Sequence, residues 1–158
     1  MKIEGEHLFK GPREVVWDMI RDPKVLMKAI PGTQELKEVE PNHYEAAIHL
    51  RIGPVSGSFS GTLVVSDEVP PESCTLTVDG RGAPGFAKGV GYVKFADNGD
   101  QTTTLGYTGD VTIGGTLASV GQRMIDSVSK MMIKAGFGTL DKALEEKLKG
   151  SSPKSGST

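Results

Sequence analysis

Apolar and polar residues alternate with a period of two through most of this chain. The first segment that alternates covers residues 2–9, and its more apolar side carries Ile3, Gly5, His7 and Phe9. Further alternating segments cover 43–52, 58–66, 73–79, 88–95 and 104–113. This period, with one apolar side, is typical of antiparallel strands that cover a core with one face and meet water with the other.

Two short helices are predicted between the first strand and the next. Gly11-Pro12 breaks the strand, and proline suits the first turn of the helix that follows. Asp22-Pro23 opens a second helix, which Pro31-Gly32 ends.

The period becomes helical after Gly114-Gly115. One long helix is expected from Thr116, which would cap it, to about Leu148, with a bend at Gly136 and Gly138. Its apolar stripe, at steps of three and four residues, is Leu117, Val120, Met124, Val128, Met131, Ala135, Leu140, Leu144 and Leu148. These elements together predict an α+β helix-grip fold, a curved antiparallel sheet around a long C-terminal helix.

Composition fits one domain over 1–148, followed by a polar tail over 149–158 that is expected to be disordered. With 37% hydrophobic residues and a formal net charge of −2, the 158 residues favour neither a disordered chain nor a nucleic-acid binder. The single cysteine cannot form an internal disulfide, and the N-terminus has no apolar signal segment. No apolar run reaches the ~18 residues of a membrane span, so a soluble, cytoplasmic protein is expected.

Small residues on the predicted inner face suggest a cavity. Ala46, Gly61, Gly89, Gly91 and Gly109 stand where a filled core would carry larger side chains. The alternative is that the strand glycines mark bends of a strongly curved sheet, and both readings are compatible. The expected pocket lining, which includes adaptable methionines that could equally be plain core, is Tyr44, Ile48, Leu50, Phe59, Leu63, Leu76, Val93, Phe95, Tyr107, Met124, Val128 and Met131.

The segment 82–89 is rich in glycine and is interpreted as a loop at the mouth of the pocket. Pro84 and Phe86 would form a lid or a rim that touches a membrane surface. The alternative is that Phe86 folds back onto the core. His7 has inward parity and is the candidate for a polar contact with a ligand, although a hydrogen-bonded core histidine is the commoner case.

No motif with a chemical mechanism survives its structural context. Gly80 to Gly85 match G-x-G-x-x-G, but Pro84 and a following strand contradict a dinucleotide site. His43 and His49 are about 20 Å apart along one strand, which excludes a shared metal ion. Residues 57–61 resemble a nucleophile elbow but have Phe59 at the nucleophile position. Neither a metal nor a catalytic constellation is therefore expected.

Three segments together resemble the carbon monoxide dehydrogenase CoxG family, within the START-like, Bet v 1-like (SRPBCC) superfamily. They are Val16-Trp17 through Asp22-Pro23 to Ile30-Pro31-Gly32, then Gly53-Pro54-Val55 with Phe59-Ser60-Gly61, and then 114–121. The resemblance covers residues 1 to about 145. The chain departs from the family at Thr33, where members often have cysteine; members bind no known metal there, so the assignment is little affected.

The resemblance implies a seven-stranded sheet and a non-catalytic accessory protein of molybdenum hydroxylases such as carbon monoxide dehydrogenase. Such a protein would link the enzyme to the membrane by carrying a quinone or another lipid-like molecule, and would need no other cofactor. Two rivals stay open. A small cyclase or hydrolase of the same fold would need His7, Asp67 and Tyr107 to converge, and a protein-docking module would have a filled core.

Overall fold

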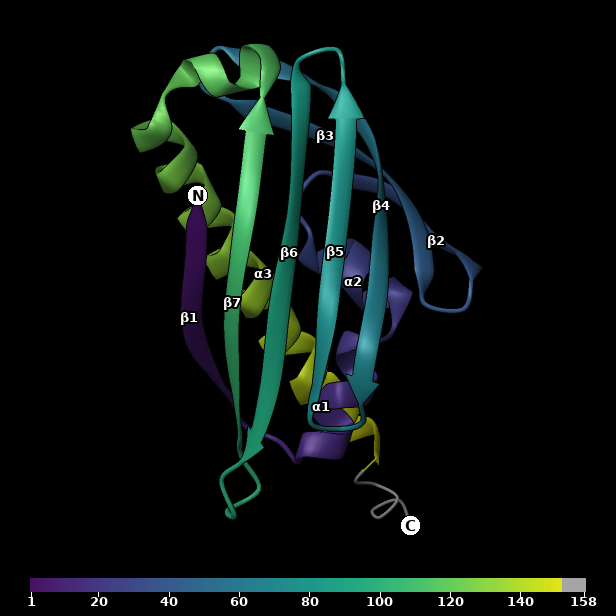
Figure 1. Cartoon of the computed structure of the whole chain (residues 1–158). Coiled ribbons are helices and arrows are strands. Elements are labelled where there is room, and N and C mark those ends of the chain that lie inside the picture. Colours follow the sequence, from purple (N-terminus) through teal and green to yellow (C-terminus); the bar gives the residue numbers. More distant parts are fainter. Residues whose placement is uncertain (152–158) are drawn as a thin grey trace.

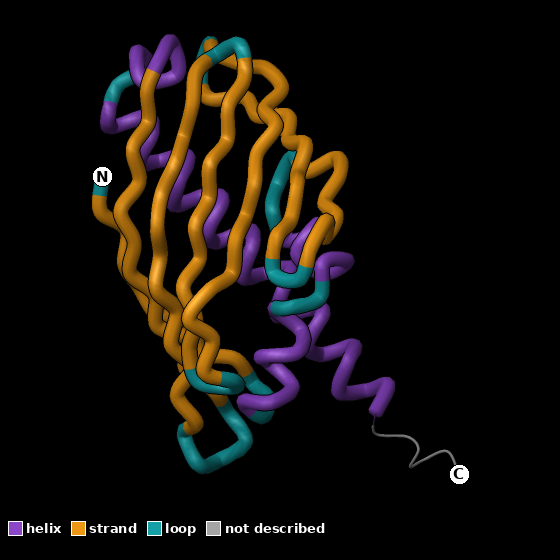
Figure 2. Tube along the Cα trace, turned by 45° about the vertical axis from the view of Figure 1, so that its right-hand side comes forward, coloured by secondary structure: helices purple, strands orange, loops and turns teal. Residues whose placement is uncertain are grey.

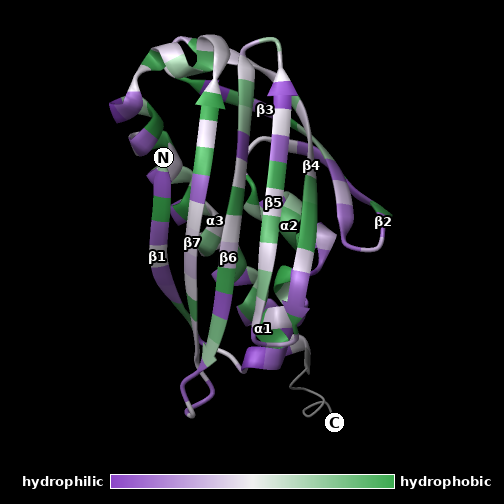
Figure 3. Cartoon of the chain, viewed as in Figure 1, coloured by the Kyte–Doolittle hydropathy of each residue, from purple (hydrophilic) through white to green (hydrophobic). Residues whose placement is uncertain are grey.

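Seven antiparallel strands form one curved sheet in the order β1-β7-β6-β5-β4-β3-β2, as the computed structural model, which describes residues 1–151, shows (Figure 1). The strands are β1 (Lys2–Phe9), β2 (Thr33–Glu40), β3 (His43–Ile52), β4 (Val55–Val69), β5 (Ser73–Gly82), β6 (Gly85–Asp97) and β7 (Thr103–Gly114). Hydrophobic and hydrophilic residues alternate along them (Figure 3). The long helix α3 (Gln122–Ser151) lies along one side of the sheet (Figure 2). The predicted helix-grip fold is confirmed.

The two short helices follow β1 as predicted. α1 (Arg13–Ile20) begins after Pro12, whose φ of −65° is the value that proline imposes. α2 (Pro23–Ala29) begins after Asp22, whose carboxylate accepts a 3.0 Å hydrogen bond from the backbone N–H of Lys24. The turn into β2 passes through Gly32, where a Cβ would lie 2.2 Å from the carbonyl oxygen of His49, so only glycine fits.

The C-terminal helical region is divided into two helices, which corrects the expectation of one helix from Thr116. A 3₁₀ helix, η1 (Gly115–Val120), ends at Gly121, and Gly121 has a φ of +95° that separates it from α3. No side chain caps η1, so Thr116 does not act as a cap. α3 continues to Ser151, and the rest of the predicted tail lies outside the described residues.

The loop expected over 82–89 is also corrected. β5 and β6 stay paired up to Gly82 and Gly85, so only Ala83 and Pro84 form the turn. A run of glycines marks a loop in most sequences, but here the glycines belong to strands.

Buried residues form two separate clusters, one towards each end of the sheet. The larger contains Phe9, Val16, Trp17, Met19, Ala29, Tyr44, Val65, Cys74, Phe95, Leu105, Leu140 and Leu144. The smaller contains Ile52, Phe59 and Leu117, with Leu50, Val55, Ile113, Val120 and Val128 packed against it. A domain of this size usually has one contiguous core, so the interval between the clusters is the place to look for a site.

Candidate functional site

The floor of the concave face is bare at its centre. Gly91 pairs with Leu76 on one side and with Gly109 on the other. A Cβ at Gly91 would meet only the carbonyl oxygen of Thr108, at 3.4 Å, and one at Gly80 only that of Ala87, at 3.8 Å. No side chain of α3 therefore lies within 4 Å of either position.

Val78 confirms that this part of the face is open. Its ladder partners are Leu63 and Gly89, both with inward parity, yet 42% of Val78 is exposed. A valine in a closely packed interior would lose nearly all its exposure. Because Val78 and Gly91 lie on adjacent strands, we interpret the middle of the concave face as an open apolar site.

Other glycines of this face serve curvature and close strand approach. A Cβ at Gly61 would lie 2.7 Å from the carbonyl oxygen of Asp79, and a Cβ at Gly89 would lie 2.7 Å from that of Asp110. Such contacts are with the backbone of the neighbouring strand and cannot be relieved by a rotamer change. The two readings left open by the sequence therefore apply to different glycines.

The two buried clusters form the ends of the open site. Of the twelve predicted pocket residues, the larger cluster includes or packs against Tyr44, Leu63, Leu76, Val93, Phe95 and Tyr107. The smaller includes or packs against Leu50, Phe59 and Val128. Ile48 has the same inward parity and is half-buried, outside both clusters. Contact of these residues with a ligand stays a prediction.

The two methionines predicted for the pocket wall are exposed. Met124 lies over Gly53 in the β3–β4 turn and is 38% exposed, and Met131 is 62% exposed. The helical period places them on the same side of α3, about a hundred degrees from Ile125, which is buried. They therefore stand beside the site rather than on its wall.

His7 faces inward and already has a partner. Its Nε2 lies 2.9 Å from Oδ1 of Asp141 on α3, and its ring stacks on that of Phe137 at 4.3 Å. This arrangement is the hydrogen-bonded core histidine that the sequence allowed. A ligand would have Nδ1 of His7 available to it.

The predicted rim residues lie at the end of the sheet beside η1. Pro84 is buried, and its carbonyl oxygen accepts a 2.7 Å hydrogen bond from the N–H of Leu117. Phe86 pairs with Arg81 in the ladder and lies on the outer face, where Arg81 and Lys88 approach its ring to 5.9 and 5.5 Å. Phe86 therefore does not fold back onto the core, and it faces away from the concave side.

The three polar residues that a catalytic site would need do not converge. His7 and Tyr107 both contact Phe137, with ring centroids at 4.3 and 5.8 Å. Asp67 is exposed, has a φ of +51° at a register shift of β4, and lies four strands from β1, about 19 Å at the usual strand spacing. Within residues 1–151, no group of three metal-ligating side chains is present either.

Sequence reasoning missed two residues of the site, Val78 and Gly80. The alternation over 73–79 gave Val78 inward parity, which was the signal that could have identified it. Gly80 was assigned to a loop motif, so its place on the strand face was not considered.

The comparisons with known proteins agree with this architecture. A conserved protein from Geobacillus kaustophilus is 32% identical, with a TM-score of 0.88 over 92% of this chain and 96% of its own. At 12% identity, a START superfamily protein from Mycobacterium smegmatis has a TM-score of 0.70 over 92% of this chain and 97% of its own. The Zhui aromatase/cyclase from a Streptomyces species, 14% identical, has a TM-score of 0.72 over 96% and 98%. No curated protein matches.

The sheet, the long helix and the open concave face define a START-like helix-grip protein. More narrowly, the family model of the carbon monoxide dehydrogenase protein CoxG matches residues 5–145. The chain therefore belongs to the CoxG family, as the sequence motifs indicated. Among the described residues, no helix combines the length and the apolar composition needed to cross a bilayer.

Proposed function

We propose that this protein binds a hydrophobic small molecule on the concave face and carries it without transforming it. The observation that carries the proposal is the bare floor at Gly80 and Gly91 beside the exposed Val78. Apolar clusters at both ends would bury most of an elongated guest, as ligand sites in proteins usually do. The CoxG family and the START-like fold are consistent with such a ligand.

The finer proposal concerns the cargo and the partner. We infer a quinone or a similar lipid-like molecule, carried between a membrane and a molybdenum hydroxylase such as carbon monoxide dehydrogenase. The support is family membership together with a site whose walls are mainly apolar and whose few polar atoms include Nδ1 of His7 and the hydroxyl of Tyr107. The protein would work in the cytoplasm and touch the membrane surface transiently.

Extraction of the purified protein tests the carrier proposal. Organic solvent should release an apolar molecule in an amount close to that of the protein, and mass spectrometry would identify its class. A protein purified without cargo should take up an added apolar probe. If nothing is released and no apolar probe binds, the carrier proposal is wrong.

A further inference from the structure

The free edge of β1 is an unprotected sheet edge among the described residues. Met1 and Val111 exchange both backbone hydrogen bonds, at 2.8 and 2.9 Å, and the ladder with β7 then runs without a register shift. In an antiparallel ladder the alternate residues point their N–H and C=O groups away from the partner. Lys2, Glu4, Glu6 and Leu8 therefore present their backbone groups along the outer edge.

The other edge of the sheet is built differently. β2 has two register shifts, between Thr33 and Glu35 and between Glu38 and Glu40, and half of its eight residues are charged. Bulges and charges are the usual means by which proteins block edge strands. β1 carries no bulge, so its regular edge is the one suited to accept another strand.

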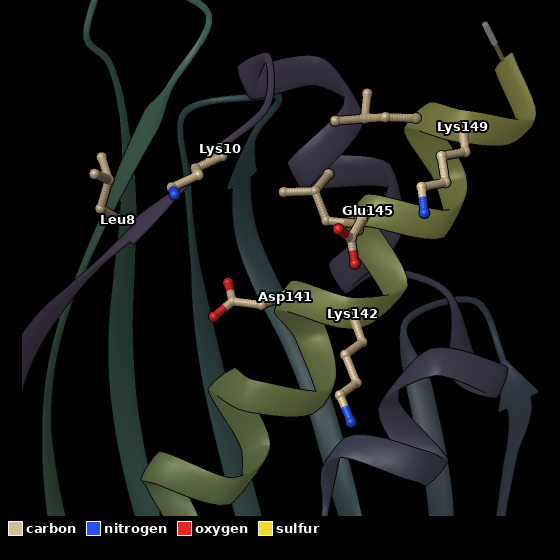
Figure 4. Close-up of a pocket in the computed structure, with 8 residues that line it drawn as sticks. Leu8, Lys10, Asp141, Lys142, Glu145 and Lys149 are labelled. Atoms are coloured by element: carbon tan, nitrogen blue, oxygen red, sulfur yellow. The ribbon is translucent and has the colours of Figure 1, made fainter.

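A groove of about 520 Å³ lies beside this edge, between the end of β1 and the last turns of α3 (Figure 4). Its apolar part comprises Leu8, which is 51% exposed, Leu144 and Leu148. Its charged part comprises Lys10, Lys142, Lys149, Asp141 and Glu145. Asp141 already holds His7, so positive charge is in excess.

We propose that this edge and groove bind an extended peptide segment of a partner protein, with apolar and acidic side chains. The segment would add a strand to β1 through the free backbone groups, and its alternate side chains would enter the groove. Apolar residues would cover Leu8 and Leu148, and a carboxylate would face the lysines.

Charge separates this occupant from two others. Residues 152–158 contain a lysine and no acidic residue, so the chain's own C-terminus does not complement the groove. A second copy paired antiparallel about Gly5 would set Glu4 opposite Glu6 at two places, and like charges facing each other are unfavourable.

The first test uses the full chain as bait for a displayed library of random eight-residue peptides. Enriched sequences should alternate β-branched residues with others and carry aspartate or glutamate. An enriched peptide, synthesised with a fluorescent label, is then titrated by polarisation. Failure to enrich any sequence above bait-free beads, or enrichment of basic sequences, contradicts the proposal.

Two variants locate the binding. Glu6→Pro removes an N–H that points to the free edge and that β7 does not use, so the fold should tolerate it. Lys142→Glu with Lys149→Glu reverses charge in the groove, and Lys130→Glu with Lys134→Glu is the matched control on the exposed part of the same helix. Each test variant should weaken peptide binding about ten-fold or more, and the control should leave it within about two-fold.

Equal binding by the wild type and by the groove double variant would overturn the proposal. The same holds if the control pair weakens binding as much as the groove pair, because the effect would then be general charge. If Glu6→Pro does not fold, the lysine pairs alone decide. Sedimentation that shows a dimer dispersed by Glu6→Pro would assign the edge to a second copy instead.

Discussion

Arg21 joins the end of α1 to the β2–β3 turn and to the end of β4. Its guanidinium donates to the side-chain oxygen of Asn42 in that turn and to the carboxylate of Glu68 on β4, and it lies 6.0 Å from the ring centroid of Trp17. Only 21% of either charged side chain is exposed. The interaction is local in space but distant in sequence, which is why the alternation pattern gave no sign of it.

Replacing Arg21 by alanine should lower the free energy of unfolding by about 1–3 kcal/mol, since Glu68 and Asn42 lose a partially buried partner. Urea denaturation followed by circular dichroism measures the loss. Arg51→Ala, at an exposed position of β3, is the control and should stay within about 0.5 kcal/mol. Equal effects of the two replacements would show that the network contributes little.

Cys74 is predicted to be unreactive in the folded protein. Burial raises the pKa of its thiol, and the nearby charge of Arg21 acts in the opposite direction and is the weaker effect. The folded state thus favours the protonated thiol, so the associated stability is present below the pKa of the unfolded thiol and is lost as the pH rises above it.

At pH 8, a thiol reagent such as iodoacetamide should modify the native protein at least about ten-fold more slowly than the protein in denaturant. A free cysteine peptide under both conditions corrects for the effect of denaturant on the reagent. Modification of the native protein at the rate of that peptide would show that the thiol is accessible and ionised.

At the scale of elements, the two glycines in the middle of α3 have different roles. A Cβ at Gly136 would lie 3.1 Å from the carbonyl oxygen of Ala29, where α2 and α3 approach each other closely. Nothing lies within 4 Å of the Cβ position of Gly138. The sequence suggested a bend at both positions, and the structure gives one continuous helix over Gln122–Ser151.

Gly138→Ala should raise the free energy of unfolding by about 1 kcal/mol, the usual gain from alanine in an exposed helix position. Gly136→Ala should gain less or lose stability, because its methyl group would push α2 away. Thermal unfolding of the two single variants compares them directly. Equal stabilisation by both would mean that α2 does not constrain α3 at this point.

The elements themselves could largely be predicted from the sequence. Period-two alternation identified the strands because one face of the sheet is buried, and Asp22-Pro23 marked α2 because its capping chemistry is local. Two errors came from glycine. Gly121 breaks the C-terminal helix through a positive φ, and the glycines of 82–89 allow strand curvature, and neither effect is visible in an apolar pattern.

For the whole molecule, the chain shows a core divided by an open concave face. The sequence predicted small residues there, because parity assigns each strand residue to a face. It could not show which glycines face empty space and which approach a neighbouring strand, since that depends on the path of β5, β6 and β7. The exposed positions of Met124 and Met131 depend likewise on the rotation of α3 relative to the sheet.

The measurement that tests the central claim most directly is binding of an uncharged fluorescent apolar probe, N-phenylnaphthylamine, to the wild type, Gly91→Val and Gly106→Val. Gly91 faces the open floor, whereas Gly106 pairs with Glu6 and Lys94 on the outer face and also has nothing within 4 Å of its Cβ position. Both replacements suit a strand, so neither should destabilise the fold. We predict that Gly91→Val weakens probe binding about ten-fold or more while Gly106→Val binds like the wild type, because only the first fills the site. Equal binding by all three proteins, folded to the same extent, would contradict the account.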